Sequence, residues 1–261
     1  MAKSLAAITG ASSGIGMVFA RKLAPHYNLL LIARRKELLD ALASELTARH
    51  GSVVTILTAD LTDETQLSVV ADRIANESTL GLLVNNAGFG LRGAFWEADL
   101  RVIEKMHRLH VMAALRLTHA ALGILVRQNR GAIINVASVA AFAQRAGSAS
   151  YGATKSWLTA LTEGIYLDLK RANSAVTVQA LCPGFTYSGF HDVIGENRKS
   201  LAPPSLWLTA EDVVDASLSA LAHGSLFVVP GWRYQLLTAI LGKLPTWLKL
   251  RVEASRTNRE G

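Results

Sequence analysis

The stretch TGASSGIG, Thr9–Gly16, decides the fold of this chain. It follows the apolar run LAAIT at residues 5–9 and opens a helical pattern. Gly10 permits a tight turn, Gly14 leaves space for a pyrophosphate against bare backbone, and Gly16 lets the helix pack close to a sheet. The helix N-terminus offers free N–H groups to phosphates. The order of strand, turn and helix therefore predicts a nucleotide site. Because the spacing differs from the common G-x-G-x-x-G, a glycine-rich loop without a ligand is the alternative.

Short apolar runs alternate with longer amphipathic segments along the chain. Strands are predicted at residues 5–9, 28–33, 53–59, 81–86, 131–137, 175–181 and 225–230. Helices are predicted near residues 15–25, 35–50, 63–77, 99–127, 151–172 and 210–223. Continuously apolar strands indicate a sheet covered on both faces, and strand–helix alternation makes it parallel. The sequence predicts a doubly wound α/β fold. One domain spans residues 1–230, and an extension follows at 231–261.

The bulk composition excludes several classes of protein. Half of the 261 residues are apolar and 18% are charged, so the chain can bury a core and is not disordered. The single cysteine, Cys182, excludes an intramolecular disulfide framework and fits a reducing compartment. We expect no signal peptide, because residues 5–9 form a first core strand. No apolar run reaches the roughly 18–20 residues that span a bilayer. A cytoplasmic location follows as an expectation.

The net charge of +7 raises the question of nucleic acid. Residues 232–261 hold six Lys/Arg and two Asp/Glu, so much of the excess lies in the tail. No basic run is interleaved with aromatic residues elsewhere, and no helix-turn-helix or RNA-binding signature occurs. We therefore expect no nucleic-acid partner.

The end of the second predicted strand indicates which nucleotide binds. An acidic residue there holds the ribose 2′-hydroxyl in NAD-binding sites. This chain has Arg34 and Arg35 instead, in IARRKELL. Guanidinium groups suit a 2′-phosphate, and Ser12 or Ser13 could donate to the same group. The alternative is a solvated basic pair, although a helix dipole disfavours cations at its N-terminus. The pattern favours NADP(H) over NAD(H).

The stretch SVAAFAQRAGSASYGATK, Ser138–Lys155, carries candidate acid–base chemistry. Tyr151 and Lys155 are four residues apart, which places them on one helix face. A nearby ammonium lowers the pKa of a phenol from its usual value near ~10. The phenol could then protonate a carbonyl oxygen, and Ser138 could hydrogen-bond the same oxygen. By itself, Y-x-x-x-K also occurs by chance on helices where the tyrosine only packs.

Several motifs occur together, in a fixed order: TGASSGIG, NNAG (Asn85–Gly88), Ser138, YGATK and CPG (Cys182–Gly184). Over roughly residues 4–230 the chain resembles the short-chain dehydrogenase/reductase family, in its short single-domain branch. The resemblance implies a seven-stranded Rossmann-like sheet, NAD(P)(H) and hydride transfer between a carbonyl and an alcohol. It also implies a homodimer or homotetramer.

The resemblance assigns roles to residues of this chain. Tyr151 matches the catalytic acid/base, Lys155 the residue that binds the nicotinamide ribose and lowers the tyrosine pKa, and Ser138 the anchor of the substrate oxygen. Arg34 matches the usual mark of NADP(H) preference. The predicted cofactor-binding set is Gly10, Ser12, Ser13, Gly14, Ile15, Gly16, Arg34, Arg35, Asp60, Leu61, Asn86, Ala87, Gly88, Tyr151, Lys155, Pro183, Gly184, Phe185 and Thr186.

The sequence departs from the family in the fourth predicted helix. The family carries an asparagine there, whose backbone carbonyl holds a water that connects the lysine to solvent. Here HRLHVMAALRLTH places His110 at that position. A histidine cation would oppose Lys155. We hypothesise that His110 stays neutral and supports the relay, as the fourth catalytic residue; the alternative is an impaired site. His107 and His110 lack a third ligand, so no metal site is expected.

The substrate side is less specific. Residues 186–209 match the family's variable lid, and Ser188 retains the hydroxyl of a threonine that many relatives carry. Apolar walls for a lipophilic or bulky carbonyl are predicted from Phe190, Ile194, Leu201, Leu206, Trp207, Phe89, Leu91, Phe95 and Trp96. The alternative is that these residues only pack the lid. Arg92 and Arg145 could meet an anionic substrate tail.

Beyond residue 231 the chain is basic and amphipathic. Apolar residues fall at helical spacing, namely Leu236, Leu237, Ile240, Leu241 and Leu244. The cations are Lys243, Lys249, Arg251, Arg256 and Arg259, with Trp232 and Trp247 among them. Such a segment can lie peripherally on an anionic membrane. Packing on its own domain or on a sister subunit is the alternative.

The sequence as a whole predicts an NADPH-dependent carbonyl reductase or alcohol dehydrogenase whose substrate is a small molecule, most simply a lipophilic ketone or alcohol. Two alternatives remain open at this point. One is a 3-oxoacyl-thioester reductase. The other is an NADP(H)-binding, membrane-associated protein that has lost turnover.

Overall fold

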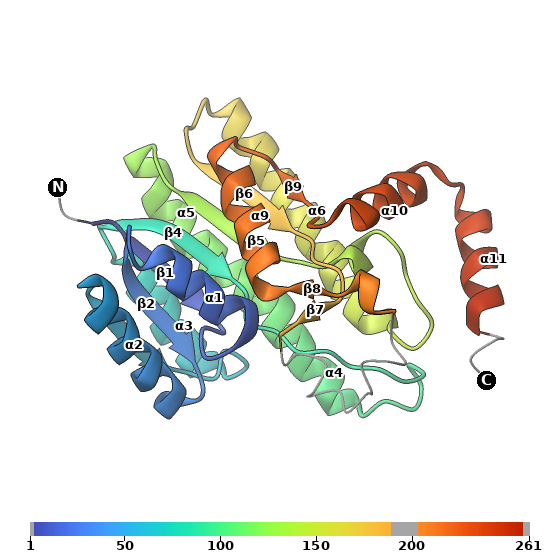
Figure 1. The fold of residues 1–261 in the computed structure, drawn as a ribbon, viewed down its shortest axis with the longest axis horizontal. Helices are drawn as coiled ribbons and strands as arrows, with labels where there is room; N and C mark the ends of the chain where they lie inside the picture. The colour runs from blue at the N-terminus through green and yellow to red at the C-terminus, as the bar shows by residue number, and fades with distance from the viewer. Residues whose placement is uncertain (1–2, 189–202, 258–261) are drawn as a thin grey trace.

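A seven-stranded parallel sheet forms the centre of the molecule. The computed structural model describes residues 3–188 and 203–257 (Figure 1). The strands run in the order β3-β2-β1-β4-β5-β6-β9, and every pairing between neighbours is parallel. Their bounds are β1 Leu5–Thr9, β2 Asn28–Ala33, β3 Val54–Thr58, β4 Leu80–Asn85, β5 Ala132–Val136, β6 Thr177–Leu181 and β9 Phe227–Val228. The predicted doubly wound α/β fold is confirmed.

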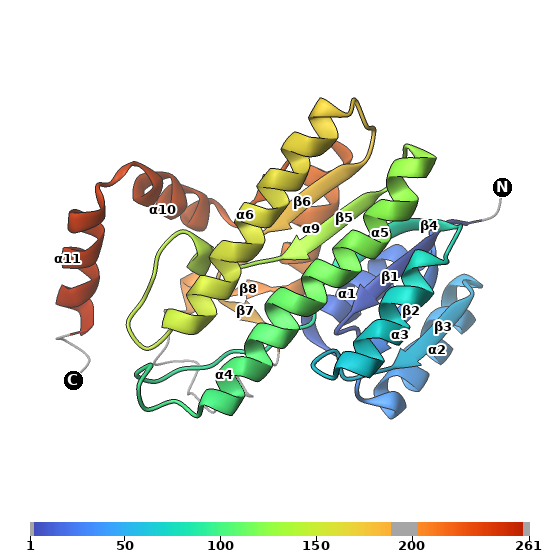
Figure 2. The same cartoon turned by 180° about the vertical axis from the view of Figure 1, so that it is seen from behind.

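Helices cover both faces of this sheet (Figures 1 and 2). On one face lie α1 (Gly14–Leu23), α2 (Lys36–His50) and α9 (Ala210–Ala222). On the other lie α3 (Glu64–Ala75), α5 (Ala114–Gln128) and α6 (Ala149–Arg171). Successive side chains of a strand point to opposite faces, so apolar strands are buried on both.

Each central strand contributes to two cores. Ile8 and Leu31 pack under α1 and α2, whereas Ala7 and Ile32 pack under α3 and α5. All four side chains are fully buried. This is why the strands read as unbroken apolar runs in the sequence and not as alternating patterns.

The helix predicted over residues 99–127 has an irregular centre. It comprises α4 (Leu100–His107), a π-helical turn η1 (Arg108–Ala113) and α5. Asp99 caps its start, where the carboxylate accepts from the backbone N–H of Arg101. Single π-helical turns widen a helix locally and often occur at functional sites. Here the turn carries His110.

The segment Leu100–Gln128 is also long and apolar enough to cross a bilayer, by length and composition alone. This differs from the expectation that no apolar segment of the chain is long enough to span a bilayer. In the most apolar 18-residue stretch of this segment, 44% is buried inside the molecule, and α5 packs on α3 and β4. A helix laid against a parallel sheet needs a broad apolar face, which explains its composition.

The described ends of the lid form a small second sheet. β7 (Thr186–Tyr187) pairs in parallel with β8 (Leu208–Thr209), just after a short 3-10 turn, η3 (Pro204–Leu206). Thr209 and Asp212 then start α9 with reciprocal hydrogen bonds between each side chain and the other's backbone. Of the predicted lid walls, Phe190, Ile194 and Leu201 lie outside the described residues.

Two helices follow the sheet in the C-terminal extension. α10 (Trp232–Lys243) and α11 (Thr246–Thr257) project from the body as an arm (Figure 1). α10 begins four residues after β9 ends at Val228, so its root lies at the carboxyl-end edge of the sheet.

The crossovers define where a ligand can enter. From β1 the chain moves to β2 and β3 on one side, and then returns past β1 to β4 on the other. The loops that leave β1 and β4 therefore diverge and leave a crevice at their carboxyl ends. The motifs singled out in the sequence follow these strands.

Candidate active site

The glycine turn after β1 is held by the NNAG segment after β4. Asn86 Nδ2 donates to the carbonyl oxygens of Thr9, at 2.9 Å, and Gly10, at 3.3 Å. Gly10 has φ +67°, and a Cβ there would lie 2.8 Å from Asn86 Nδ2. A Cβ on Gly16 would collide with the Gly10 carbonyl and Asn86, so α1 packs on the turn itself. Both glycines are therefore required by close approach of neighbouring backbone and amide groups.

Thr9 fastens the ends of β1 and β4 together. Its Oγ1 donates to the Val84 carbonyl at 3.3 Å. The same oxygen accepts from the N–H groups of Asn86 and Ala87 at 2.9 and 3.0 Å. The two loops that border the crevice are thus one hydrogen-bonded unit.

Gly14 contacts a part of the chain that the sequence did not indicate. Its φ is +54°, and a Cβ would lie 2.9 Å from the Cβ of Ser188, at the base of the lid. That Gly14 leaves space for a pyrophosphate against bare backbone stays a prediction, and the structure adds Ser188 as a close neighbour of this glycine. The lid base comes close enough that only glycine fits beneath it.

Arg35 joins the glycine turn from the end of β2. Its Nη2 donates to Ser12 Oγ at 2.9 Å and to Ser13 Oγ at 2.7 Å, and its Nε donates to Ser12 Oγ at 3.2 Å. The guanidinium and two hydroxyls form one polar cluster at the N-terminus of α1. Such a cluster combines charge with several hydrogen-bond donors, as an anion requires.

Arg34 lies apart from that cluster. Its side chain is 68% exposed, and its Nη1 is 3.8 Å from Asp60 Oδ2. Asp60 accepts from the Thr62 N–H and hydroxyl at 3.0 and 2.7 Å and also meets Lys105 Nζ at 3.7 Å. Burial acts to raise the pKa of Asp60, but the Thr62 hydrogen bonds and the two cations outweigh it and lower that pKa. The neighbouring Leu61 is buried and lines the cavity described below.

Ser138 and Tyr151 come together after β5. Ser138 lies at the start of the 3-10 turn η2 (Val139–Ala141), where its Oγ accepts from the Ala140 N–H at 3.1 Å. Its hydroxyl also hydrogen-bonds the Tyr151 phenol, which lowers the phenol pKa in part. Burial dominates and raises the pKa of Tyr151 to about 12. At neutral pH the phenol therefore keeps its proton.

Lys155 is buried one helical turn after Tyr151. Its Nζ donates to the Val136 carbonyl at 2.9 Å and lies 5.7 Å from the centroid of the Tyr151 ring. Burial lowers the pKa of Lys155 to about 8. That Lys155 lowers the pKa of Tyr151 stays a prediction, because the net pKa of the phenol is dominated by burial. The ammonium is directed at a backbone carbonyl, and desolvation of the phenol is larger than any effect of the cation.

His110 is buried in the π-helical turn. Its Nε2 accepts from the Phe89 N–H at 3.1 Å, so the ring proton is on Nδ1. Nδ1 then donates to Thr154 Oγ1 at 3.0 Å, and that hydroxyl donates to the Tyr151 carbonyl at 2.8 Å. Burial and the charge of Lys155 hold the pKa of His110 well below its usual value. These contacts favour the predicted neutral imidazole, and its part in a proton relay stays a prediction.

The position of the imidazole depends on Gly88. A Cβ at residue 88 would lie 2.9 Å from His110 Nε2. The histidine therefore fits because NNAG ends in glycine. Sequence reasoning missed Thr154, the partner of the other ring nitrogen, although it lies inside the quoted YGATK.

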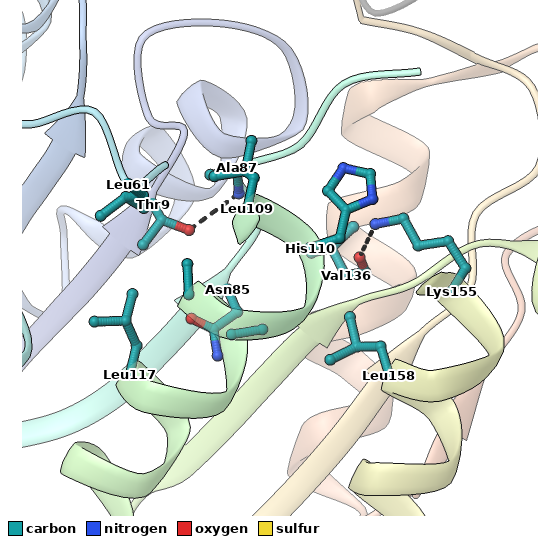
Figure 3. Close-up of a pocket in the computed structure, with 12 residues that line it drawn as sticks. Thr9, Leu61, Asn85, Ala87, Leu109, His110, Leu117, Val136, Lys155 and Leu158 are labelled. Atoms are coloured by element: carbon teal, nitrogen blue, oxygen red, sulfur yellow. Dashed lines mark hydrogen bonds between the residues drawn. The ribbon is translucent and has the colours of Figure 1, made fainter. Parts of the chain in front are cut away.

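A narrow cavity lies between the loops that follow β1 and β4 and the side chains of His110 and Lys155 (Figure 3). Thr9 and Ala87 line one side, and His110 and Lys155 line the other. It leaves about 10 Å³ for the centre of a water molecule, which is room for about one. Asn85 Oδ1, also in the lining, has no hydrogen-bond partner among the described residues.

The loop after β6 is fastened by Tyr234, which sequence reasoning missed. The Phe185 N–H donates to Tyr234 Oη at 3.0 Å, and Oη donates to the Leu206 carbonyl at 2.6 Å. The ring lies against Gly184, where any Cβ would overlap it. Pro183 accepts from Ser138 Oγ at 3.4 Å, so this loop also touches the candidate catalytic residues. Nothing in the spacing of Tyr234, far along the chain, pointed to this contact.

The predicted substrate walls divide into two groups. Trp207 is buried and stacks on Tyr187, with centroids 4.9 Å apart, so it packs the lid base and does not line an opening. Phe95 and Trp96 are 57% and 84% exposed. Their loop is held near residue 147, where the Gly93 N–H donates to the Gly147 carbonyl at 3.0 Å.

Comparison with known proteins gives the same family from sequence and from structure. The family model described as short chain dehydrogenase matches residues 4–199. The "CLA biosynthesis dehydrogenase/reductase" of Lactiplantibacillus plantarum is 32% identical over 204 residues, which cover 76% of this chain and 70% of that protein.

Two solved structures superpose over most of the chain. One is a short-chain dehydrogenase from Sphingobium yanoikuyae in complex with NADPH, with 32% identity, TM-score 0.83 and coverage of 93% of this chain and 97% of that one. The other is the bulky-bulky ketone specific alcohol dehydrogenase from Comamonas testosteroni, with 30% identity, TM-score 0.79 and coverage of 94% and 96%. From the match of family, fold and motif order, the chain belongs to the short-chain dehydrogenase family of oxidoreductases.

Proposed function

We propose that this protein is an NADP(H)-dependent carbonyl reductase or alcohol dehydrogenase for a bulky, lipophilic substrate. The observation that carries the proposal is the group Ser138, Tyr151 and Lys155. Two hydrogen-bonded hydroxyls and a buried ammonium lie together beyond the carboxyl ends of the central strands. A carbonyl oxygen bound there would meet a hydrogen-bond donor and a proton donor in one place.

The residues at the crevice fit the phosphates of a dinucleotide. The glycine turn is shaped by Asn86, and a helix N-terminus follows it. The cluster of Arg35, Ser12 and Ser13 suits a 2′-phosphate because it offers charge and hydroxyl donors together. The likeness to a structure in complex with NADPH supports NADP(H) over NAD(H).

The protein groups supply the proton half of the reaction. A bound NADPH would supply the hydride for the carbonyl carbon. Ser138 Oγ would donate a hydrogen bond to the carbonyl oxygen, and Tyr151 Oη would transfer its proton to that oxygen to give the alcohol. Because burial raises the pKa of Tyr151 to about 12, the phenol is protonated at neutral pH and ready for reduction. Lys155, with its pKa lowered to about 8, is still mainly charged and would stabilise the phenolate left behind.

His110 does not oppose this chemistry. A neutral imidazole places no second cation beside Lys155. His110 and the basic tail are the two features that favour an impaired binding protein, and a neutral His110 no longer counts against turnover.

The substrate class is proposed from exposed aromatic residues on a loop that is hydrogen-bonded just before the helix of Tyr151. Phe95 and Trp96 expose apolar surface on the loop that runs beside residue 147. The likeness to an alcohol dehydrogenase specific for bulky-bulky ketones supports a large apolar carbonyl over a sugar.

NADPH oxidation tests the proposal, with NADH in parallel, across bulky ketones, aldehydes and 3-oxoacyl thioesters. Wild type is expected to turn over bulky ketones with NADPH. Tyr151→Phe keeps the ring and removes the proton, and should lower turnover by about 10²–10⁴-fold while NADPH still binds. The control Tyr166→Phe, on the outer part of α6, should turn over like wild type. Equal activity of Tyr151→Phe and wild type would contradict the assigned role. Faster turnover of 3-oxoacyl thioesters than of bulky ketones would show that the thioesters are the substrate class.

A further inference from the structure

The C-terminal arm, defined here as α10 and α11, carries apolar surface on its outward side. Trp232, Leu236 and Ile240 are four residues apart and share one face of α10. Their exposed fractions are 65%, 54% and 49%. Trp247 and Leu250 on α11 are 64% and 62% exposed. A helix normally turns its apolar stripe to the core, so this arrangement is reversed.

The inward side of α10 explains why the arm holds this orientation. Tyr234 is buried and hydrogen-bonds Phe185 and Leu206. Gln235 Nε2 donates to the Val229 carbonyl at 3.0 Å, and Arg233 Nη1 donates to the Ser205 carbonyl at 3.3 Å. Polar groups thus anchor the root of the helix, and the apolar face stays outward.

The excess of positive charge on the arm favours an anionic partner over a second copy of the chain. Over residues 232–257 the sequence has one acidic residue, Glu253, and five cations, namely Arg233, Lys243, Lys249, Arg251 and Arg256. A twofold contact between two such arms would bring like charges together. An anionic surface would neutralise them, and lysine and arginine can keep their charges at headgroup level while their stems lie along apolar surface.

We propose that the C-terminal arm docks on an anionic lipid membrane, with the outward face of α10 and the exposed side chains of α11 in the headgroup region. Exposed apolar surface and cations on one short helical segment provide the two attractions that interfacial helices use. The root of the arm contacts the loop after β6 through Tyr234, so docking would bring the carboxyl-end edge of the sheet toward the bilayer. A lipophilic carbonyl dissolved in that bilayer would then be close to the crevice, which is the part of this proposal that rests on the proposed function.

Vesicle flotation of the full chain tests the docking directly. The probes are vesicles of pure phosphatidylcholine and of equal parts phosphatidylcholine and phosphatidylglycerol. Wild type should float with the anionic vesicles at least ten times better than with the neutral ones, and high salt should reduce the difference. Leu236→Glu/Ile240→Glu and Lys243→Glu/Lys249→Glu should each lower the bound fraction about tenfold or more.

Matched controls separate the arm from general surface effects. Val69→Glu changes a side chain on α3 that is 54% exposed, the same fraction as Leu236. Arg49→Glu/Arg127→Glu reverses two exposed charges far from the arm. Both control variants should float like wild type. NADPH oxidation of a water-soluble ketone without vesicles measures the proposed function separately, and should be unchanged in the arm variants.

Two results would overturn the proposal. One is wild type that fails to float with anionic vesicles, or floats equally with both kinds. The other is a concentration-dependent dimer, seen by sedimentation velocity, that Leu236→Glu/Ile240→Glu abolishes, because a second copy would then cover the face. Quenching of Trp232 and Trp247 by brominated lipid, lost in Trp232→Phe/Trp247→Phe, would support insertion at headgroup depth.

Discussion

The Nδ1 of His110 lies 3.0 Å from the hydroxyl of Thr154, and that hydroxyl donates to the backbone carbonyl of Tyr151. On its other side the imidazole accepts from Phe89, next to the NNAG segment. The side chain of His110 therefore ties the turn that carries Tyr151 to the loop after β4. This makes His110 a positioning residue for the proposed acid, a role that an asparagine side chain is too short to fill at both ends.

We predict that His110 makes the protein sensitive to mild acid. Below pH ~6.5 the unfolded chain binds a proton on this residue, whereas the folded chain, with its pKa held well below that value, does not. The unfolded state then holds more protons, so the free energy of unfolding falls as the pH falls, by up to about 1.4 kcal/mol per pH unit. Urea unfolding between pH 7 and pH 5 should show a shallower decline in His110→Asn. The exposed His119→Asn is the control and should follow wild type; an unchanged slope in His110→Asn would contradict the buried neutral state.

We predict that Lys155→Met stabilises the protein and abolishes turnover. A pKa of about 8, against 10.5 for a free lysine, corresponds to a burial penalty of about 3 kcal/mol at neutral pH. Loss of the hydrogen bond to the Val136 carbonyl offsets about 1–2 kcal/mol of the gain. A net rise of about 1–2 kcal/mol in the free energy of unfolding is expected at pH 7.

The stability gained in Lys155→Met depends on pH. Between pH 8 and 10.5 the unfolded chain keeps the proton that the folded chain releases, so wild type gains stability as the pH rises. The advantage of Lys155→Met should therefore disappear across that window. The exposed Lys170→Met should change stability by less than about 0.5 kcal/mol. Lower stability of Lys155→Met at pH 7 would show that the lysine is not under a burial penalty.

We predict that Arg35 and not Arg34 sets the preference for NADPH. Arg35 lies on the Ser12–Ser13 hydroxyls, whereas Arg34 is exposed and faces Asp60. Charged hydrogen bonds are worth about 1.5–3 kcal/mol, so Arg35→Ala should raise the KM for NADPH about 10–100-fold and leave that for NADH nearly unchanged. Arg34→Ala is the matched comparison, and a larger effect there would reverse the assignment.

We predict that the hydroxyl of Tyr234 orders the loop beside the candidate site. Tyr234→Phe keeps the ring over Gly184 but leaves the Phe185 N–H and the Leu206 carbonyl without their partner. A loss of about 1–3 kcal/mol in unfolding free energy is expected. NADPH affinity should fall several-fold, because the loop after β6 loses the two hydrogen bonds that Tyr234 Oη makes with Phe185 and Leu206. Calorimetric titration of NADPH and thermal unfolding measure the two effects. If Tyr234→Phe binds NADPH as tightly as wild type but is less stable, the hydroxyl of Tyr234 supports the fold and does not order the cofactor site.

The sequence predicted the elements of the fold well because their causes are local. Short apolar runs such as LLLIA, in the strand predicted at residues 28–33, indicate strands covered on both faces, and that strand appears as β2 with the predicted bounds. The glycine turn was recognised because a strand, a turn and a helix follow one another within a few residues. The π-helical turn at His110 was not predicted, and the hydrogen-bond partners of His110, which are Phe89 and Thr154, are distant in sequence.

In the candidate site, too, some features follow from local sequence and others depend on tertiary contacts. Motif order alone singled out Ser138, Tyr151 and Lys155, because short spacings on a helix and after a strand fix which side chains can meet. Tertiary structure decided the rest: that Lys155 bonds a backbone carbonyl, that burial raises the pKa of Tyr151, and that Arg35 turns to the serines while Arg34 turns to Asp60. Desolvation and pairing depend on which distant segments come together, and no spacing along the chain encodes them. The contact of Tyr234 with Phe185, across 49 positions, exists only because the extension folds back onto the end of the sheet.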